Sequence, residues 1–503
     1  SNKIYQIPIN MKKIIQLSIL TFLLLIASCT KSDSEDVIEP VVNDDINYFI
    51  WKGMNAYYLW QKDVPDLADN RFATFSELYT YFRGYSSPEN VFESLLNRSA
   101  DRFSWIVDDY IELENSFQGI NVSNGMEFGL KRYNNSAVNI YGYVRYVIPN
   151  SDAAAKGIKR GMLFNSVNGT QLTDSNYTSL LFGTSTNYTA EFADYNNGNP
   201  ISNGTSVSLN KTQLQENPVA ISKVITDGNK KIGYLLYNQF ASTYDRQLNA
   251  AFANFKAANV DELIIDLRYN GGGSVRTSTY LGGMITGQFN GQLYSKEIWN
   301  EKVQDAVSAD RFLNNFTDEI KNTDQNGNVV VQENINSLNL NSVYFIVSGS
   351  TASASELVIN SLSAYIDVKL VGTKTVGKQV GSITLYDSED LQRDGNNLNP
   401  DHRYAMQPIV LKIANSEGYA DYTDGLIPDY FAEEELQNLG SLGAKDEPLL
   451  SLALNIIQDS IVLTEKKEIF SNKFRLNNDL VTNKQEMYSD KGKLLRKGLK
   501  SKL

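Results

Sequence analysis

The segment VYFIVSGSTASASELVINSL, residues 343–362, joins an apolar run to a stretch with helical spacing. Five consecutive apolar residues predict a buried strand, and the hydroxyl residues that follow predict the start of a helix. Ser353 and Glu356 have the S-x-x-E spacing of a capping box, which would satisfy free N–H groups of the first helical turn. A serine at a helix N-terminus also lies in positive potential, beside backbone donors that could hold an oxyanion. The segment alone leaves capping and chemistry open.

The same alternation of strand and helix extends to both sides of this segment. The runs are KKIGYLLYNQF (230–240), LNAAFANFKAANV (248–260), DELIIDLRYNGGGSV (261–275) and VKLVGTKTVGKQVGS (368–382). Strand, helix and strand in that order predict a largely parallel sheet flanked by helices, with a site in the loops at the carboxyl ends of the strands. Two such loops are RYNGGGS (268–274) and SGSTAS (348–353).

Two further regions precede this core. Apolar residues spaced by three and four predict a small helical bundle from about residue 46 to 102, whose aromatic stripe we expect to be core. Between about residues 116 and 182 the period shortens to that of strands. We therefore predict a multidomain α/β (α+β) fold, with these parts: 1–28 upstream residues plus signal peptide, 29–44 flexible acidic tether, 45–112 helical domain, 113–206 β-rich domain, 207–462 core, 463–503 basic tail.

Composition excludes several functions. The 503 residues carry a net charge of −12, which argues against a nucleic-acid partner because phosphate binding needs a basic face. The chain has one histidine, His402, and one cysteine, Cys29. A zinc site built on these residue types lacks ligands, and a Ser-His-Asp triad would have to use His402. The hydrolytic mechanisms that this composition permits use a Ser or Thr nucleophile with a Lys base, paired carboxylates, or an oxygen-ligated metal.

The N-terminal part predicts export. From Met11 the sequence reads MKKIIQLSILTFLLLIASC, which has the lysines, the short apolar run and the small residues of a signal peptide. Its end, IASC, resembles the lipobox of bacterial lipoproteins, which implies a lipid on Cys29; the alternative is ordinary signal-peptide cleavage with Cys29 incidental. Residues 1–10 precede Met11, the expected initiator, and are not expected to belong to the fold. The acidic run after Cys29 resembles surface-export signals of some lipoproteins, and we expect the basic tail to be a solvated or frayed end.

If Ser353 is a nucleophile, a base must accept its proton, and the candidates are His402 and a lysine. Lys378 follows the next predicted strand, between glycines in VGKQVG, and so returns to the same edge of the sheet. A lysine acts as a base only when its neutral form is populated, which burial away from carboxylates favours. The flanking residues carry no acid.

These motifs resemble the C-terminal processing peptidases, tail-specific serine peptidases that use a Ser-Lys pair. The resemblance covers roughly residues 116–455 and rests on SASE (353–356), Gly377-Lys378 with Lys378 25 residues after Ser353, the NGGG loop, and GLIPD (425–429). Residues 147–172 resemble the second half of a PDZ domain, with MEFGL (126–130) as the loop that would receive a peptide carboxylate.

The resemblance implies roles for individual residues. Ser353 would be the nucleophile and Lys378 the general base. The oxyanion hole would use the N–H of Ala354 and of Gly273, with Gly272 in reserve. Many family members have a Gln four residues after the lysine; Ser382 stands there, so Ser382 or the adjacent Gln379 would orient Lys378. The peptide-binding residues of the PDZ-like domain would be Phe128, Gly129 and Leu130.

Two of these residue assignments have alternatives. Ser355 is the nucleophile if the register slips, and Gly271 to Gly273 also fit a plain strand-to-helix turn.

The resemblance predicts a serine endopeptidase of the cell envelope, as an outer-membrane lipoprotein facing the periplasm or the outside. It would act on protein or peptide substrates, without metal or organic cofactor. The competing functions are a peptide-binding lipoprotein without turnover and a glycan hydrolase with two carboxylates. The oligomeric state and the physiological substrate are not predicted.

Overall fold

The computed structural model describes residues 42–324, 327–393, 398–459, 487–489 and 491, so Cys29 and the signal peptide lie outside the described residues. The chain divides into the units Ser1–Asp45 and Ile46–Leu503, and the second unit holds the sheets and their cores. The α-helices are α2 (Val42–Tyr57), α3 (Phe75–Phe82), α4 (Pro88–Ser94), α5 (Tyr110–Phe117), α6 (Asp152–Ala155), α7 (Tyr177–Phe182), α8 (Asp245–Ala258), α9 (Val275–Ile285), α10 (Glu301–Ala306), α11 (Ala354–Ser363) and α12 (Pro448–Ile457).

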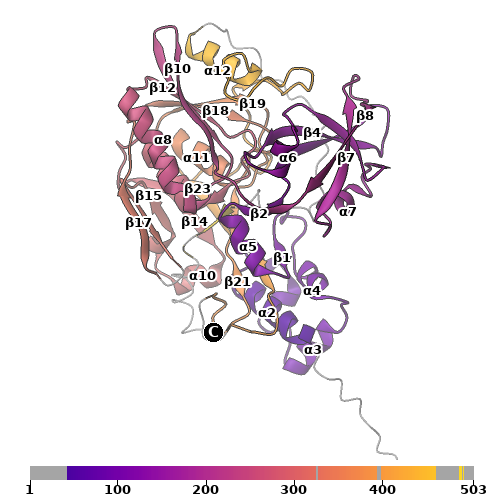
Figure 1. The fold of residues 1–503 in the computed structure, drawn as a ribbon. Helices are drawn as coiled ribbons and strands as arrows, with labels where there is room; N and C mark the ends of the chain where they lie inside the picture. Colours follow the sequence, from indigo (N-terminus) through magenta and orange to yellow (C-terminus); the bar gives the residue numbers. More distant parts are fainter. Residues whose placement is uncertain (1–41, 325–326, 394–397, 460–486, 490, 492–503) are drawn as a thin grey trace, which may run out of the picture. The chain divides into compact units, whose positions relative to one another are not determined.

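The central sheet has the strand order β10-β11-β12-β18-β19-β24. Its strands are β10 (Val219–Asp227), β11 (Lys230–Tyr237), β12 (Glu262–Asp266), β18 (Ser342–Val347), β19 (Asp367–Gly372) and β24 (Tyr430–Phe431). β10 and β11 form an antiparallel hairpin, and every other neighbouring pair is parallel. The predicted largely parallel sheet is confirmed (Figure 1).

Helices cover both faces of this sheet because its strands alternate between two apolar cores. On β11, Leu235 and Tyr237 belong to the larger core, which contains residues of α8, α9 and α11. Tyr234 and Leu236 point to the opposite face, where α12 packs. The carboxyl ends of the strands are thereby fixed between two layers, and the loops that follow β12, β18 and β19 meet at one edge.

The β-rich domain has a core of its own and a sheet of order β3-β4-β5-β7-β8, with β6 on β5. Its strands are β2 (Ile120–Ser123), β3 (Met126–Arg132), β4 (Ile140–Val147), β5 (Leu163–Val167), β6 (Thr170–Gln171), β7 (Asn187–Asp194), β8 (Ile201–Asn210) and β9 (Thr212–Gln215). The predicted strand, short helix and Asn-Gly hairpin turn are confirmed as β4, α6 and the turn at Asn168-Gly169, where both residues have positive φ.

The predicted carboxylate loop at residues 126–130 is wrong. Phe128, Gly129 and Leu130 lie in β3, which pairs with β4 and forms one edge of the sheet. The reason is the alternation of apolar side chains: Met126 and Leu130 are buried in the domain core and Phe128 packs against it. The ring of Phe128 also lies 5.9 Å from that of Phe182 at the end of α7.

The N-terminal helices pack into the same apolar core as the central sheet. Phe49, Met54 and Phe92 are buried in it together with residues of β11 and α11, so the aromatic stripe is core as expected. The short strand β1 (Trp105–Val107) pairs with β22 (Ala405–Gln407), which in turn pairs with β21 (Leu385–Tyr386). α2 begins at Val42, so the helix reaches into the predicted tether 29–44.

A second six-stranded sheet has the order β13-β25-β20-β23-β14-β15. Its strands are β13 (Gly273–Ser274), β14 (Leu293–Trp299), β15 (Leu313–Asn315), β20 (Val380–Ser382), β23 (Ile409–Asn415) and β25 (Met487–Tyr488), and a separate hairpin joins β16 (Glu319–Thr323) to β17 (Val329–Asn334). The predicted solvated end is wrong for the described part of the tail, because β25 is a strand and Met487 is fully buried. None of the helices among the described residues has the length and apolar character that a membrane span requires.

Candidate active site

Three loops meet at the carboxyl edge of the central sheet. The N–H of Ala352, after β18, donates to the carbonyl of Asn270 in the loop after β12 (3.1 Å). The N–H of Val376, in the loop after β19, donates to the carbonyl of Thr351 (3.0 Å). The loops that carry the NGGG motif, Ser353 and Lys378 are therefore neighbours, as the parallel topology predicts.

Ser353 combines burial, strain and an unused hydroxyl. Its side chain is fully buried, and its Oγ has no hydrogen-bond partner among the described residues. Its φ of 66° and ψ of −118° lie in a region that non-glycine residues rarely adopt, which costs of the order of 1–3 kcal/mol. A strained residue with an unsatisfied buried hydroxyl points to a functional role, because structural serines find a partner.

Glu356 holds Ser353 and Lys378 together. One carboxylate oxygen, Oε2, accepts the backbone N–H groups of Ser353 and of Lys378, both at 2.8 Å. The other, Oε1, accepts the N–H of Gly377 (2.7 Å) and the hydroxyl of Thr375. Burial raises the pKa of Glu356, and its four donors act in the opposite direction. The acid half of the predicted capping box is thus present, and the same carboxylate fixes the lysine loop.

The N-terminal helical domain contributes to the surroundings of Lys378. Its Nζ lies 4.9 Å from the centre of the Phe103 ring, in cation–π range, and both side chains are buried. The neighbouring Arg102 donates to the carbonyl oxygens of Gly377 (3.1 Å) and Thr423 (3.0 Å). These contacts clamp the turn at Gly377, whose φ of 85° is natural only for glycine.

The two predicted oxyanion glycines differ in their surroundings. The N–H of Gly272 donates to the side chain of Asn270 (2.9 Å), so this reserve candidate is already engaged. Gly273 has a φ of 138°, and a Cβ there would lie 2.3 Å from the carbonyl oxygen of Phe240, so only glycine fits. The N–H of Ala354, the first residue of α11, takes part in no hydrogen bond among the described residues.

The remaining predicted residues divide into near and distant ones. Ser355 donates its hydroxyl to the carbonyl of Asn270 (3.1 Å), which gives it a structural partner that Ser353 lacks. Ser382 is buried and donates its hydroxyl to the carbonyl of Met487 (3.3 Å). Gln379 is buried beside Lys378, and its carbonyl accepts the N–H of Ile413. His402 contacts Asp387 (2.8 Å), outside the three loops.

Comparison with known proteins relates two regions of the chain to one peptidase family. Residues 231–392 match the Peptidase family S41 and residues 45–105 match the Peptidase S41 N-terminal domain. The chain contains a peptidase family S41 domain. The S41 match supports a serine-type peptidase, whose substrates are proteins or peptides. No curated protein matches the chain in sequence.

One solved structure agrees with the fold of the chain. The chain is similar to a candidate S41 protease from Bacteroides fragilis NCTC 9343, with a TM-score of 0.61 and 24% identity over 82% of this chain and 98% of that one. It is also similar to the photosystem II D1 C-terminal processing protease, with a TM-score of 0.47 and 16% identity over 82% of this chain and 97% of that one.

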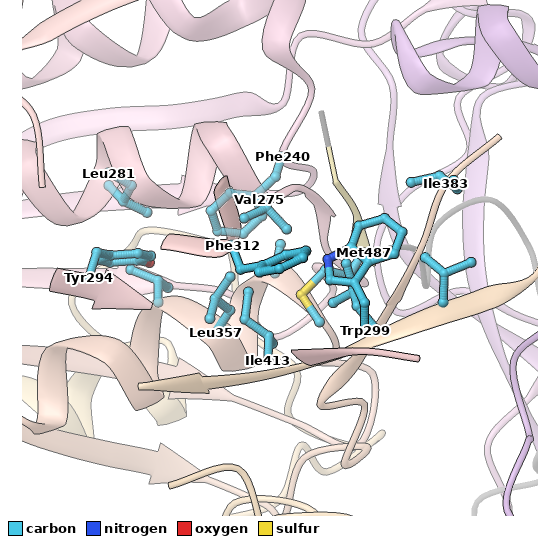
Figure 2. Close-up of a cluster of buried hydrophobic side chains, with 14 of the residues drawn as sticks. Phe240, Val275, Leu281, Tyr294, Trp299, Phe312, Leu357, Ile383, Ile413 and Met487 are labelled. Carbon is cyan, nitrogen blue, oxygen red and sulfur yellow. The ribbon is translucent and has the colours of Figure 1, made fainter. Parts of the chain in front are cut away.

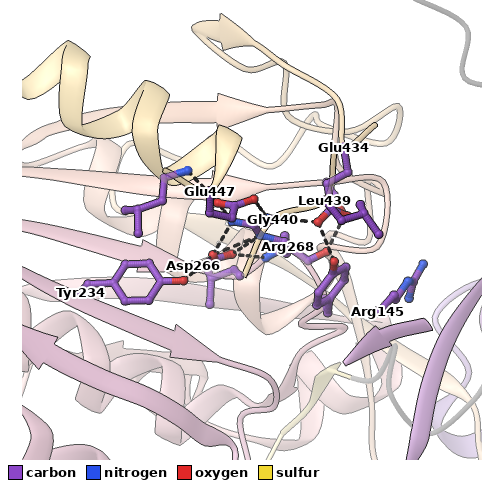
Figure 3. A network of polar contacts seen from close by, with 12 residues as sticks. Arg145, Tyr234, Asp266, Arg268, Glu434, Leu439, Gly440 and Glu447 are labelled. Atoms are coloured by element: carbon purple, nitrogen blue, oxygen red, sulfur yellow. Dashed lines mark hydrogen bonds and ion pairs between the residues drawn. The ribbon is translucent and has the colours of Figure 1, made fainter. Parts of the chain in front are cut away.

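A buried ionic network lies next to the NGGG loop of the S41 domain and includes Arg268 at the start of that loop (Figure 3). Arg268 is fully buried and bonds Asp266 (2.7 Å), Glu447 (2.6 Å) and Glu434 (3.0 Å). Arg160 of the β-rich domain also bonds Glu434 (2.7 Å). Burial alone would raise the pKa of Glu434, but the two guanidinium groups lower it to about 2. The network ties the β-rich domain to the loop beside Ser353.

Proposed function

We propose that the protein is a serine endopeptidase that hydrolyses exported, unfolded or C-terminally exposed proteins through a Ser-Lys acyl-enzyme mechanism. The observation that carries the proposal is the buried hydroxyl of Ser353, which has no partner among the described residues and is held to the Lys378 loop by Glu356. The S41 match supports the reaction class.

The mechanism assigns one step to each group. Neutral Lys378 accepts the proton of Ser353, and the alkoxide attacks the carbonyl carbon of the scissile peptide bond. The N–H groups of Ala354 and Gly273 stabilise the tetrahedral oxyanion. The protonated lysine then donates to the leaving amine, and water, activated by the same lysine, hydrolyses the acyl-enzyme. Ser382 or Gln379 would orient Lys378, and no metal or organic cofactor takes part.

The β-rich domain would select or gate substrates as a PDZ-like module. Its edge strand β3 lies beside α7, as the Phe128–Phe182 contact indicates. An extended peptide added to β3 would use main-chain hydrogen bonds for affinity and the side chains between β3 and α7 for specificity. Phe128 and Gly129 would contact the peptide, whereas Leu130 supports β3 from the core.

The protein would reach its substrates as a lipoprotein of the bacterial cell envelope, at the outer membrane. The support is the sequence alone: a signal peptide from Met11 and Cys29 in a lipobox-like context. Replacing Cys29 with Ser should abolish incorporation of radiolabelled palmitate and release the protein from the membrane fraction. Unchanged incorporation would refute the anchor without affecting the catalytic proposal.

The catalytic proposal is tested by hydrolysis of casein. Wild type should cleave it, whereas Ser353→Ala and Lys378→Ala should lose at least about 10³-fold in rate while retaining their circular dichroism spectra. Ser355→Ala is the matched control, because its hydroxyl bonds a carbonyl and it should retain most activity. If Ser353→Ala remained active, the assignment would be wrong. An inert wild type across pH would favour the peptide-binding lipoprotein.

A further inference from the structure

The C-terminal strand β25 lies between two strands that carry candidate catalytic groups. Met487 pairs with Gly273 and Tyr488 with Ser274 on β13, in parallel. On its other side Tyr488 pairs with Ser382 of β20, also in parallel. β20 begins two residues after Lys378. A segment remote in sequence therefore occupies a strand position between the oxyanion glycine and the base-bearing loop.

The hydrogen-bond pattern of β13 shows where the N–H of Gly273 points. The carbonyl of Gly272 and the N–H of Ser274 both bond Phe240, on one side of the strand. Because backbone groups of successive residues alternate between the two sides of a strand, the N–H of Gly273 faces the other side, where β25 lies. The proposed oxyanion donor thus faces the C-terminal strand.

β20, on the other side of this position, also forms hydrogen bonds with the segment that contains β25. The hydroxyl of Ser382, a candidate orienting group for Lys378, donates to the carbonyl of Met487 (3.3 Å). The N–H of Ser489 donates to the carbonyl of Ser382 (3.0 Å). A strand in this position therefore contacts both walls of the catalytic centre through its main chain, which is how an extended peptide substrate is held.

Three side chains anchor the strand in surroundings of different chemistry. Met487 is fully buried in the apolar core beside Trp299 (Figure 2). The ring of Tyr488 lies 4.5 Å from that of Phe117. The hydroxyl of Ser489 donates to the carboxylate of Glu297 (3.1 Å). Together these surroundings accept a flexible apolar residue, then an aromatic one, then a small hydroxyl residue.

We propose that the position between β13 and β20 is the substrate-strand site of this peptidase, and that β25 occupies it in the resting protein. The proposal rests on the proposed function. The substrate is an extended peptide in which an unbranched apolar residue is followed by an aromatic one. This peptide replaces β25 and places its main chain against Gly273. The chain's own C-terminal strand is then a competitive intramolecular inhibitor.

The test compares the full chain with two truncations, one that ends at residue 486 and lacks β25, and a control that ends at 491 and keeps it. The readout is the rate at which a fluorophosphonate probe labels Ser353. We expect the chain ending at 486 to be labelled at least tenfold faster than the full chain and the control to match the full chain. The peptide QEMYSDK (485–491) should return the faster rate to that of the full chain, whereas the same peptide with Met487→Asp should have no effect.

Slower or unchanged labelling of the chain ending at 486, or activation of it by the added peptide, would overturn the proposal and make β25 a supporting strand. If this truncation does not fold, Ser489→Pro in the full chain decides. It removes the N–H that bonds Ser382 and should raise the labelling rate several-fold; an unchanged or lower rate overturns the proposal. Whichever result is obtained, the proposed function stands if the probe labels the full chain and does not label Ser353→Ala.

Discussion

Glu434 offers a quantitative test of the network beneath the NGGG loop. Its carboxylate lies between Arg160 (2.7 Å) and Arg268 (3.0 Å) and accepts the hydroxyl of Tyr269 (2.6 Å). The pKa falls from 4.5 to about 2 on folding. At 1.36 kcal/mol for each tenfold change in proton affinity, the ionised carboxylate contributes about 3 kcal/mol at neutral pH. Glu434→Gln should remove that contribution while conserving shape.

The sign of the pH dependence follows from the lowered pKa. The contribution is fully present above the unfolded pKa of about 4.5 and is lost as the pH falls toward 2. The difference between wild type and Glu434→Gln should therefore shrink on acidification and fall below half of its neutral value by about pH 3.

Thermal unfolding followed by circular dichroism measures the effect. For a cooperative unit of about 460 residues, with an unfolding entropy of about 2.1 cal/mol/K per residue, a loss of about 3 kcal/mol corresponds to a Tm lower by roughly 3 °C. The matched control is the neighbouring Glu433→Gln, whose carboxylate is 3.9 Å from Lys131 and partly exposed, and which should change stability by less than about 1 kcal/mol. Equal Tm values for the two variants at pH 7, or a difference that does not shrink in acid, would refute the assignment of the stabilisation to this charge.

Two further predictions concern the loops that carry Ser353 and Lys378. Glu356→Gln replaces one acceptor oxygen by an NH2 group that faces N–H donors, so kcat/KM should fall about 10²-fold or more with the fold retained; near wild-type kinetics would show that the carboxylate does not position the pair. Phe103→Leu keeps an apolar cover but removes the cation–π attraction for the lysine ammonium, so the acid limb of the kcat/KM pH profile should move to lower pH by about 0.5–1 unit; an unmoved limb would contradict a role for the ring in the charge state of Lys378.

Sequence pattern predicted those parts of the molecule that depend on local periodicity and connection. Alternating strands and helices were sufficient for the parallel sheet, and parallel order was sufficient to bring the loops of Ser353 and Lys378 to one edge. The aromatic stripe of the N-terminal helices was correctly assigned to core because helical spacing leaves one apolar face.

Three of the missed features depend on contacts between segments that are separated in the sequence. Nothing near Phe103 signals that it covers a lysine 275 residues later. Glu356 matched a capping box, a local motif that does not show that the carboxylate also binds the loop at Lys378. β25 has two residues, too few for any period to be visible, and its basic surroundings indicated a solvated end. The carboxylate loop was placed by resemblance to a PDZ domain, whereas the local alternation of Met126, Phe128 and Leu130 makes this segment a strand.

The shared core of the N-terminal helices and the S41 domain has a consequence for how the chain acquires its structure. β1 pairs with β22, which lies about 300 residues later in the sequence. β13 pairs with β25, which lies near the far end of the chain. The helical domain therefore cannot be completed until the chain has been synthesised to at least residue 407. The β-rich domain has its own core, and β2 pairs with the nearby β9, so this domain can fold early. Long-range closure of this kind is slow, so we expect the β-rich domain to fold before β1 pairs with β22 and before β13 pairs with β25.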